Sequence, residues 1–324
     1  EHDPWGHFEA QPNLRPANRV RRRDDPRLQR GGSQGNRPFD LPRLEGASRI
    51  RRRERRSKGR CMMDLSSLKT ADIKSMLAQG VEDEAAFVQA MREDKRVSVQ
   101  KLAQSYLKRK QKEEAERERV LHMYAMETAY YNKGVYHVAG VDEAGRGPAA
   151  GPVMIAAVIL PPYWECPGLN DSKKLSPAKR DALYDKIMAE AVAVSCVSKS
   201  EKEIDALDIY HATMQGMYDA VDGLDTAAEA VLIDAMPLRD LTVPHQSVVH
   251  GDAVSASIAA ASIIAKVTRD RLMVAYDKTY PQYGFAVHKG YLTQRHMDAL
   301  HEYGPCPIHR RSFEPIKSMV KHTI

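Results

Sequence analysis

Apolar residues recur every three or four positions through most of residues 64–132, the spacing that places them on one face of a helix. Three groups share this spacing: Ile73, Met76 and Leu77; Phe87, Ala90 and Met91; and Leu102, Tyr106 and Leu107. Gly80 offers a stop after the first group, and Lys108–Arg119 is charged enough to form a solvated helix. We therefore predict that residues 62–133 form an N-terminal helical extension, which stabilises or docks rather than contacts substrate.

From residue 134 onward, short apolar runs of strand length replace the helical spacing. Four such runs are Tyr136–Val141, Val153–Leu160, Ala191–Ser198 and Ala228–Ile233. Helices are predicted at 177–189, behind the N-cap Ser176 and with Pro177 first, and also at 251–277 and 293–303. Strands that alternate with helices indicate an α/β layered domain over residues 134–324, with a helical segment at its C-terminal end.

Residues 1–61 show no apolar period and are rich in Arg, Pro, Gly and Asn, which predicts disorder. Residues 1–60 hold 17 of the 49 Lys and Arg but 8 of the 43 Asp and Glu, so they carry a charge of +9 and the rest carries −3. The net charge of +6 therefore describes this leader and not the remainder. Two explanations stay open: a native start at Met62 or Met63 behind a leader foreign to the protein, or a basic arm that binds nucleic acid non-specifically.

Composition narrows the class of protein further. No run of apolar residues is long enough to span a bilayer, and the first residues lack the apolar core of a secretory signal, so we expect a cytoplasmic protein. The scattered cysteines favour reduced thiols over a disulfide framework or a zinc site. These cysteines are Cys61, Cys166, Cys196 and Cys306. His288, His296 and His309 lack zinc-ligand spacing, which favours structural roles.

The most distinctive run is Gly140–Pro148, in which two adjacent carboxylates end an apolar stretch and a glycine-rich turn follows. Like charges raise each other's pKa, so a fold keeps Asp142 and Glu143 together mainly where a cation binds. Oxygen ligands alone suit Mg²⁺ or Mn²⁺. The glycines around Arg146 let the backbone approach a phosphate or a sugar closely. The run therefore predicts metal-assisted chemistry on a phosphodiester.

Two further aspartates occupy comparable positions. Asp234 ends the apolar run before it, and Asp252 follows another apolar stretch just before the predicted helix at 251–277. Either one alone would read as a helix or turn cap. Because ligand sites gather at strand ends in α/β sheets, these side chains can converge with Asp142 and Glu143. Four converging carboxylates indicate a two-metal hydrolytic site.

Four blocks of the chain closely resemble the signature blocks of bacterial ribonuclease HII. They are GVDEAGRGPAAGPV at 140–153, DSKKL at 171–175, GDAVSASIAAASIIAKVTRDRL at 251–272 and GPCPIHRRSF at 304–313. The resemblance runs in unbroken order over roughly residues 134–316, and Pro148 favours type HII over its HIII relative. Residues 1–61 resemble nothing in the family.

The resemblance implies an RNase H-like fold, with a central mixed sheet flanked by helices. Its catalytic and metal-binding carboxylates map onto Asp142, Glu143, Asp234 and Asp252. It also implies that the backbone of Gly145, Arg146 and Gly147 senses the ribose 2′-OH, and that Tyr291 stacks on the neighbouring sugar.

The implied activity is hydrolysis of RNA in RNA–DNA hybrids, together with cutting 5′ of single ribonucleotides in duplex DNA. The products would carry 5′-phosphate and 3′-OH ends, and the enzyme would be a monomer using two Mn²⁺ or Mg²⁺ ions. Two rivals remain, a related nuclease or resolvase of the same fold and a catalytically silent hybrid-binding protein.

Several basic residues near these blocks have open roles. Lys173 and Lys174 follow an Asp-Ser pair and are expected to contact phosphate, although a solvated loop is the simpler alternative. Arg269 is equally consistent with a phosphate contact and a surface position. Arg310 and Arg311 are consistent with packing of the tail or with contact to a duplex backbone.

Overall fold

A computed structural model describes residues 64–321, so the expectations for residues 1–61 and for Cys61 fall outside the described chain. Within that range the chain divides into two compact units, residues 64–113 and residues 114–321. No helix of the described chain is long and apolar enough to cross a membrane.

The first unit is helical, as its apolar spacing predicts. It contains α1 (Thr70–Gln79), α2 (Glu84–Glu93) and the first part of α3 (Val97–His122), which continues into the second unit. Its core includes Ile73, Leu77, Phe87, Met91 and Tyr106.

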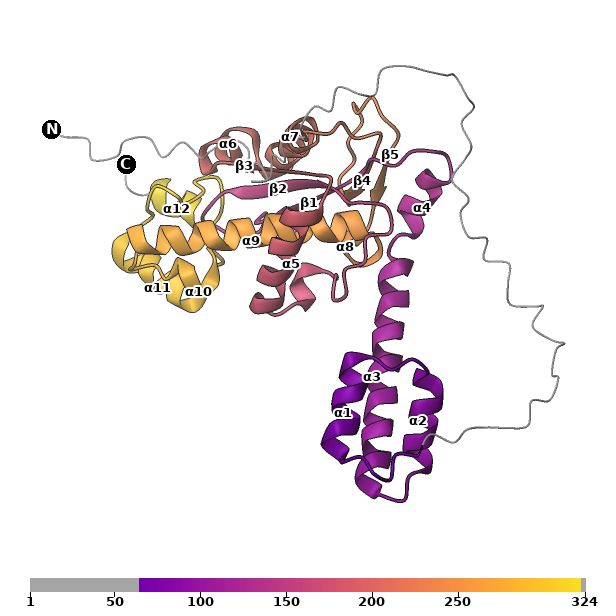
Figure 1. The fold of residues 1–324 in the computed structure, drawn as a ribbon. Helices are drawn as coiled ribbons and strands as arrows, with labels where there is room; N and C mark the ends of the chain where they lie inside the picture. The colour runs from indigo at the N-terminus through magenta and orange to yellow at the C-terminus, as the bar shows by residue number, and fades with distance from the viewer. Residues whose placement is uncertain (1–63, 322–324) are drawn as a thin grey trace, which may run out of the picture. The chain divides into compact units, whose positions relative to one another are not determined.

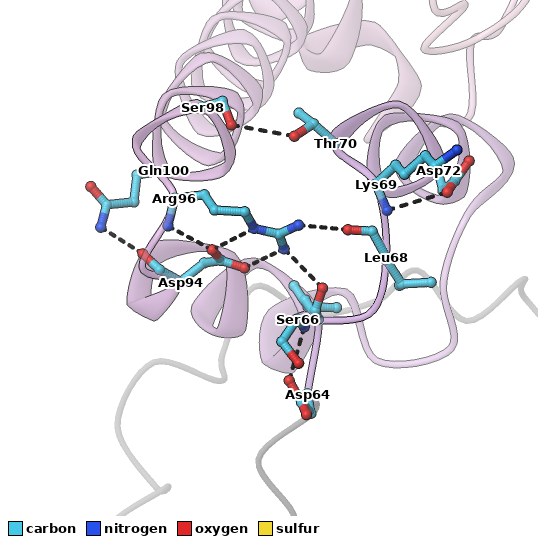
Figure 2. Close-up of polar contacts among 11 residues, drawn as sticks. Asp64, Ser66, Leu68, Lys69, Thr70, Asp72, Asp94, Arg96, Ser98 and Gln100 are labelled. Carbon is cyan, nitrogen blue, oxygen red and sulfur yellow. Dashed lines mark hydrogen bonds and ion pairs between the residues drawn. The ribbon is translucent and has the colours of Figure 1, made fainter.

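Arg96, in the turn between α2 and α3, joins that turn to the segment before α1 (Figure 2). Its guanidinium donates to the carbonyl of Leu68 at 2.6 Å and to that of Leu65 at 2.8 Å, while it pairs with Asp94 at 2.6 Å. Hydrogen bonds from Arg96 lower the pKa of Asp94 to about 2. These contacts are structural, and no part of the predicted site lies among them.

The second unit is built on a five-stranded mixed sheet of order β3-β2-β1-β4-β5. Its strands are β1 (Val138–Ala144), β2 (Val153–Ile159), β3 (Ala193–Lys199), β4 (Ala230–Asp234) and β5 (His245–Val248). β1 and β2 run antiparallel, as do β2 and β3, whereas β1, β4 and β5 run parallel. The predicted α/β class is confirmed, and three parallel strands end at one edge of the sheet.

Helices cover both faces of this sheet (Figure 1). One face packs against α4 (Ala125–Tyr131), α5 (Pro177–Glu190) and α9 (Ala256–Thr279). The other packs against α6 (Glu201–Leu207) and α7 (Ile209–Asp222). The remaining helical elements are η1 (Ser172–Lys174), α8 (Gly251–Val254), α10 (Phe285–His288), α11 (Gln294–Tyr303) and α12 (Ile316–Lys321).

Helix α9 lies directly on β1 because Gly140 has no side chain. A Cβ added to Gly140 would stand 2.1 Å from the backbone carbon of Ser257, closer than real atoms approach. The prediction of one helix over 251–277 is wrong at one point. Ser255 is extended (φ −119°, ψ 131°) and separates α8 from α9.

Candidate active site

Asp142 and Glu143 lie in the last residues of β1 rather than after it, because the strand continues to Ala144. β1 and β4 are parallel neighbours with Val141 opposite Ile233, so Asp142 near the end of β1 lies beside Asp234 at the end of β4. Both belong to the face of the sheet that α9 covers, since strand side chains alternate. Asp142 is only 4% exposed.

Asp252 lies at the same end of the sheet as Asp142 and Asp234, on the helix that follows β5. β5 pairs with β4, and α8 follows it with Asp252 as its second residue. The Asp234 carboxylate accepts a hydrogen bond from the N–H of Gly251 at 2.7 Å, which joins β4 to the start of α8. The structure thus places all four predicted carboxylates at one sheet edge, three of them on the parallel strands β1 and β4 and the fourth in α8, just after β5.

Burial makes this carboxylate cluster electrostatically unfavourable. Desolvation raises the pKa of Asp142 well above its ordinary value, and the charges of Glu143 and Asp234 raise it further. Desolvation likewise raises the pKa of Glu143, although Arg146 opposes the shift. The pKa of Asp252 is raised by burial and then by Asp171. A cation bound among these groups would relieve the repulsion.

Lys173 brings a positive charge to the Asp252 side of the cluster. Its ammonium lies 3.6 Å from the Asp252 carboxylate and its side chain is 78% exposed. The charges of Asp252, Asp142, Asp171 and Asp234 all act to raise the pKa of Lys173 against its desolvation. Lys174 instead faces Asp171 at 3.9 Å, so the two lysines differ in what they contact.

Asp171 is a fifth carboxylate of the site that sequence reasoning did not single out. It caps η1 by accepting the N–H of Lys173 at 2.8 Å, and its charge reaches Asp252. Asp171 is the first residue of the block at 171–175, in which only the two lysines were assigned a possible role in phosphate contact.

The residues fit divalent cations by chemistry. The buried Oε2 of Glu143 has no hydrogen-bond partner, so a strong acceptor is available for a ligand. All the donors are carboxylate oxygens, which suits Mg²⁺ or Mn²⁺. Within residues 64–321, no group of three His, Cys, Asp or Glu is already arranged to hold a metal ion.

The glycine-rich turn lies beside this cluster. Gly145 has φ +97°, a conformation that favours glycine, and Arg146 contacts the Glu143 carboxylate at 3.3 Å. Gly147 is exposed, and a Cβ built on it would stand 3.7 Å from the ring of Tyr291. Tyr291 is itself 49% exposed. The structure thus brings together Gly147 and Tyr291, which are far apart in sequence.

Of the three arginines whose roles were left open, Arg269 and Arg310 are buried and Arg311 is exposed. Arg269 and Arg310 are 1% and 0% exposed, and they donate to backbone carbonyls beneath the glycine-rich turn. Arg311 is exposed, and its N–H donates to Asp205 at 2.9 Å. The tail-packing alternative therefore holds for Arg310.

His288, His296 and His309 are buried next to one another: the rings of His288 and His296 stack, and His296 and His309 share a hydrogen bond. His296 Nδ1 lies 2.9 Å from the carbonyl of Tyr291, which can only accept, so that nitrogen carries the proton. His296 Nε2 must then accept from His309 Nε2 at 2.9 Å, and His309 Nδ1 accepts the N–H of Cys306. His288 similarly bonds Tyr283 and Gly290. These hydrogen bonds support the turn that carries Tyr291.

Comparison with known proteins agrees with this geometry. Residues 139–316 match the family described as ribonuclease HII, and residues 69–131 match its N-terminal domain. Ribonuclease HII of Bacillus cytotoxicus is 49% identical over 245 residues, covering 76% of this chain and 94% of that protein. Ribonuclease HII of Bacillus cereus is 44% identical over 257 residues, covering 79% of this chain and 100% of that protein. The crystal structure of ribonuclease H2 from Pyrococcus horikoshii superposes with a TM-score of 0.50 at 26% identity, covering 57% of this chain and 97% of that one.

Proposed function

This chain belongs to the ribonuclease HII family, and from that premise we propose that Asp142, Glu143, Asp234 and Asp252 carry out its reaction. Ribonuclease HII is a metal-dependent endoribonuclease that acts on RNA–DNA hybrids. The observation that carries the assignment of residues is the convergence of these four carboxylates at the ends of β1 and β4 and at the start of α8.

The carboxylates would hold divalent ions, Mn²⁺ or Mg²⁺, expected as a pair. Such ions supply a nucleophilic water at neutral pH and stabilise the charge that develops on the leaving oxygen. A bound cation would favour the charged form of Asp142, whose pKa is raised by burial and by the charges of Glu143 and Asp234. Glu143 offers an unpartnered oxygen, and its other oxygen stays on Arg146, which fixes the carboxylate plane. Asp234 keeps one oxygen on the Gly251 amide and leaves the other for a ligand.

Substrate choice would come from the turn beside the carboxylates. We assign ribose recognition to the backbone of Gly145, Arg146 and Gly147, because 146 and 147 are exposed and the turn adjoins Glu143. The ring of Tyr291 lies next to Gly147 and would stack on the adjacent sugar. Lys173 would meet a phosphate near Asp252, whereas Lys174 would reach one only by leaving Asp171. With this arrangement the enzyme would also cut 5′ of a single ribonucleotide in duplex DNA, acting as a cytoplasmic monomer and leaving 5′-phosphate and 3′-OH ends.

One assay tests the assignment. A duplex with one ribonucleotide and an all-RNA hybrid are each incubated with Mg²⁺ or Mn²⁺ and either the native chain or Asp142→Asn. We expect Asp142→Asn to lose cleavage by at least a thousandfold while its duplex affinity stays within about threefold, because Asn is isosteric but cannot offer an anionic ligand. Retained turnover with Mn²⁺ would show that Asp142 is not a metal ligand. Hybrid binding without cleavage by the native chain would instead favour a silent binding protein.

A further inference from the structure

Two buried guanidinium groups lie under the glycine-rich turn and bond to its carbonyls. Arg310, in the loop before α12, donates to the carbonyls of Gly145 at 2.6 Å, Arg146 at 2.8 Å and Gly151 at 2.9 Å. Arg269, on α9, donates to the carbonyls of Ala150 and Pro152 at 3.0 Å and of Lys289 at 2.9 Å. Together they engage five carbonyls between residues 145 and 152 and one beside Tyr291.

The fit around these arginines is close. A Cβ added to Gly145 would stand 1.9 Å from Nε of Arg269, and one added to Gly151 would lie 3.3 Å from its Nη2. Gly145 and Gly151 both have positive φ, so the turn is shaped around the guanidinium groups. No side chain longer than hydrogen could occupy either position without displacing Arg269 or its neighbour Met273.

Neither arginine has a carboxylate partner. No acidic group within residues 64–321 lies within ion-pair distance of Arg269 or Arg310. Burial, and then repulsion from Arg269, lower the pKa of Arg310 to about 9, so Arg310 remains charged at neutral pH. Burial also lowers the pKa of Arg269. Three backbone carbonyls accept from each guanidinium, and the charge of Glu201 acts to raise the pKa of both. Because all three acceptors of Arg310 lie within residues 145–151, its hydrogen bonds fix the backbone of the turn.

We propose that Arg269 and Arg310 are positioning residues that set ribose recognition by fixing the peptide planes of residues 145–147. Because the carbonyls of Gly145 and Arg146 point at Arg310, the exposed amides of Arg146 and Gly147 are left for substrate. Within the described chain those two amides have no protein acceptor. The two guanidinium charges lie directly behind them and favour an anionic or hydroxyl oxygen at that surface. This inference rests on the proposed role of the turn.

Arg310→Lys separates geometry from charge. Lysine keeps the positive charge but cannot bond the two adjacent carbonyls through one planar group, as the guanidinium does. Arg310→Met removes the charge at similar length. If the peptide planes matter, both variants lose activity, and Arg269→Lys does so from the other side of the turn.

The test uses the full chain and measures kcat and KM on a duplex with one ribonucleotide, along with inhibition by an all-DNA duplex of the same sequence. We expect Arg310→Lys to lower kcat at least tenfold, while the inhibition constant of the all-DNA duplex changes less than threefold. Met217→Ala, a fully buried change on α7 against the opposite face of the sheet, is the control for lost stability. It should lower Tm and leave kcat and the inhibition constant unchanged.

Two results would overturn the inference. One is a native kcat in Arg310→Lys, and the other is a loss that follows Tm equally in Arg310→Lys and Met217→Ala. If Arg310→Met fails to fold, Arg269→Lys gives the same readouts. If the native chain and Met217→Ala also fail to cleave the duplex, the proposed function itself is wrong. If both cleave it, the result for Arg310→Lys tests the role of the arginines alone.

Discussion

The Lys173 side chain is expected to affect metal binding and substrate binding in opposite directions. Its ammonium stands 3.6 Å from Asp252, where a divalent cation would also be attracted. Lys173→Ala should therefore strengthen metal binding, while weakening substrate binding if this lysine contacts phosphate. Because the Lys173 side chain is 78% exposed, solvent screens the pair to about 0–1 kcal/mol, so the half-saturating Mn²⁺ concentration should fall by about fivefold at most.

The measurement is a pair of titrations of cleavage rate, one against Mn²⁺ and one against duplex concentration. KM for the duplex should rise in Lys173→Ala as the Mn²⁺ requirement falls. Lys186→Ala is a matched control, because that lysine pairs with Glu190 at 2.7 Å on the surface of α5. A Mn²⁺ requirement that rises in Lys173→Ala would mean that the lysine assists metal binding.

Among single residues, the sequence predicted the positions of the site carboxylates better than those of the buried arginines. Asp142 and Asp234 were predictable because each ends an apolar run, and parallel strand ends meet at one edge. The roles of Arg269 and Arg310 were not, since an arginine in a polar stretch normally lies on the surface. Only the tertiary structure places backbone carbonyls around them.

Among the elements, α4 holds the junction between α8 and α9 in place. Glu127 on α4 is 1% exposed and accepts from the hydroxyls of Ser255 and Ser257 and from the amide of Ser257. The carbonyl of Met123, just before α4, accepts the amide of Ala256 at 3.1 Å. Since Asp252 lies one turn before this junction, α4 indirectly controls where that carboxylate stands.

Glu127→Gln should therefore reduce both stability and turnover. Replacing a carboxylate that accepts three hydrogen bonds with an amide costs about 1–3 kcal/mol, and each kcal/mol lowers Tm by roughly 2–4 °C in a domain of this size. If Asp252 also shifts, kcat falls and more Mn²⁺ is needed, while KM stays constant. Thermal melts and Mn²⁺ titrations measure the two effects, with the exposed Glu118→Gln as control. A lower Tm at native kcat and Mn²⁺ requirement would limit Glu127 to stability.

The predicted helices and strands differ from the observed ones where tertiary contacts determine where an element begins or ends. Four strands were predictable to within about three residues, because buried strands are continuous apolar segments. The short strand β5 (His245–Val248) was not predicted, since most of its residues are polar or partly exposed. The break at Ser255 was not, since the Ala- and Ser-rich segment after it has a good helical sequence. That break depends on Ser255 capping Ile258 and on Glu127, which lies more than a hundred residues away.

The stability of the whole molecule should depend on pH through its buried histidines. Burial lowers the pKa of His296 and of His309 from 6.5 to about 4. Both are neutral in the fold, whereas the unfolded chain takes up protons near pH 6.5. The two histidines therefore make their full contribution to the free energy of unfolding above pH 6.5. That contribution decreases as the pH drops toward 4, by about 1.4 kcal/mol per pH unit for each histidine.

Denaturant unfolding of the native chain, His309→Gln and the exposed His301→Gln at several pH values between 7 and 4 measures this dependence. The slope should decrease by about one proton in His309→Gln and stay unchanged in His301→Gln. Equal slopes in all three proteins would mean that His309 carries a proton in the fold, against the hydrogen-bond pattern that leaves it neutral.

Charge distribution over the whole chain separates attraction to nucleic acid from recognition of it. Residues 1–60 carry +9 and the rest −3, so non-specific attraction should come mainly from the first segment. Deleting residues 1–61 should flatten the decrease of duplex affinity with salt, because every phosphate that the protein no longer neutralises reduces the slope of log K against log salt by about 0.9. The preference for a single ribonucleotide over all-DNA duplex should stay within about twofold, since the turn at 145–147 and Tyr291 remain. Binding at 50–300 mM salt measures both quantities, and an unchanged salt slope would show that the basic segment does not act as a nucleic-acid arm.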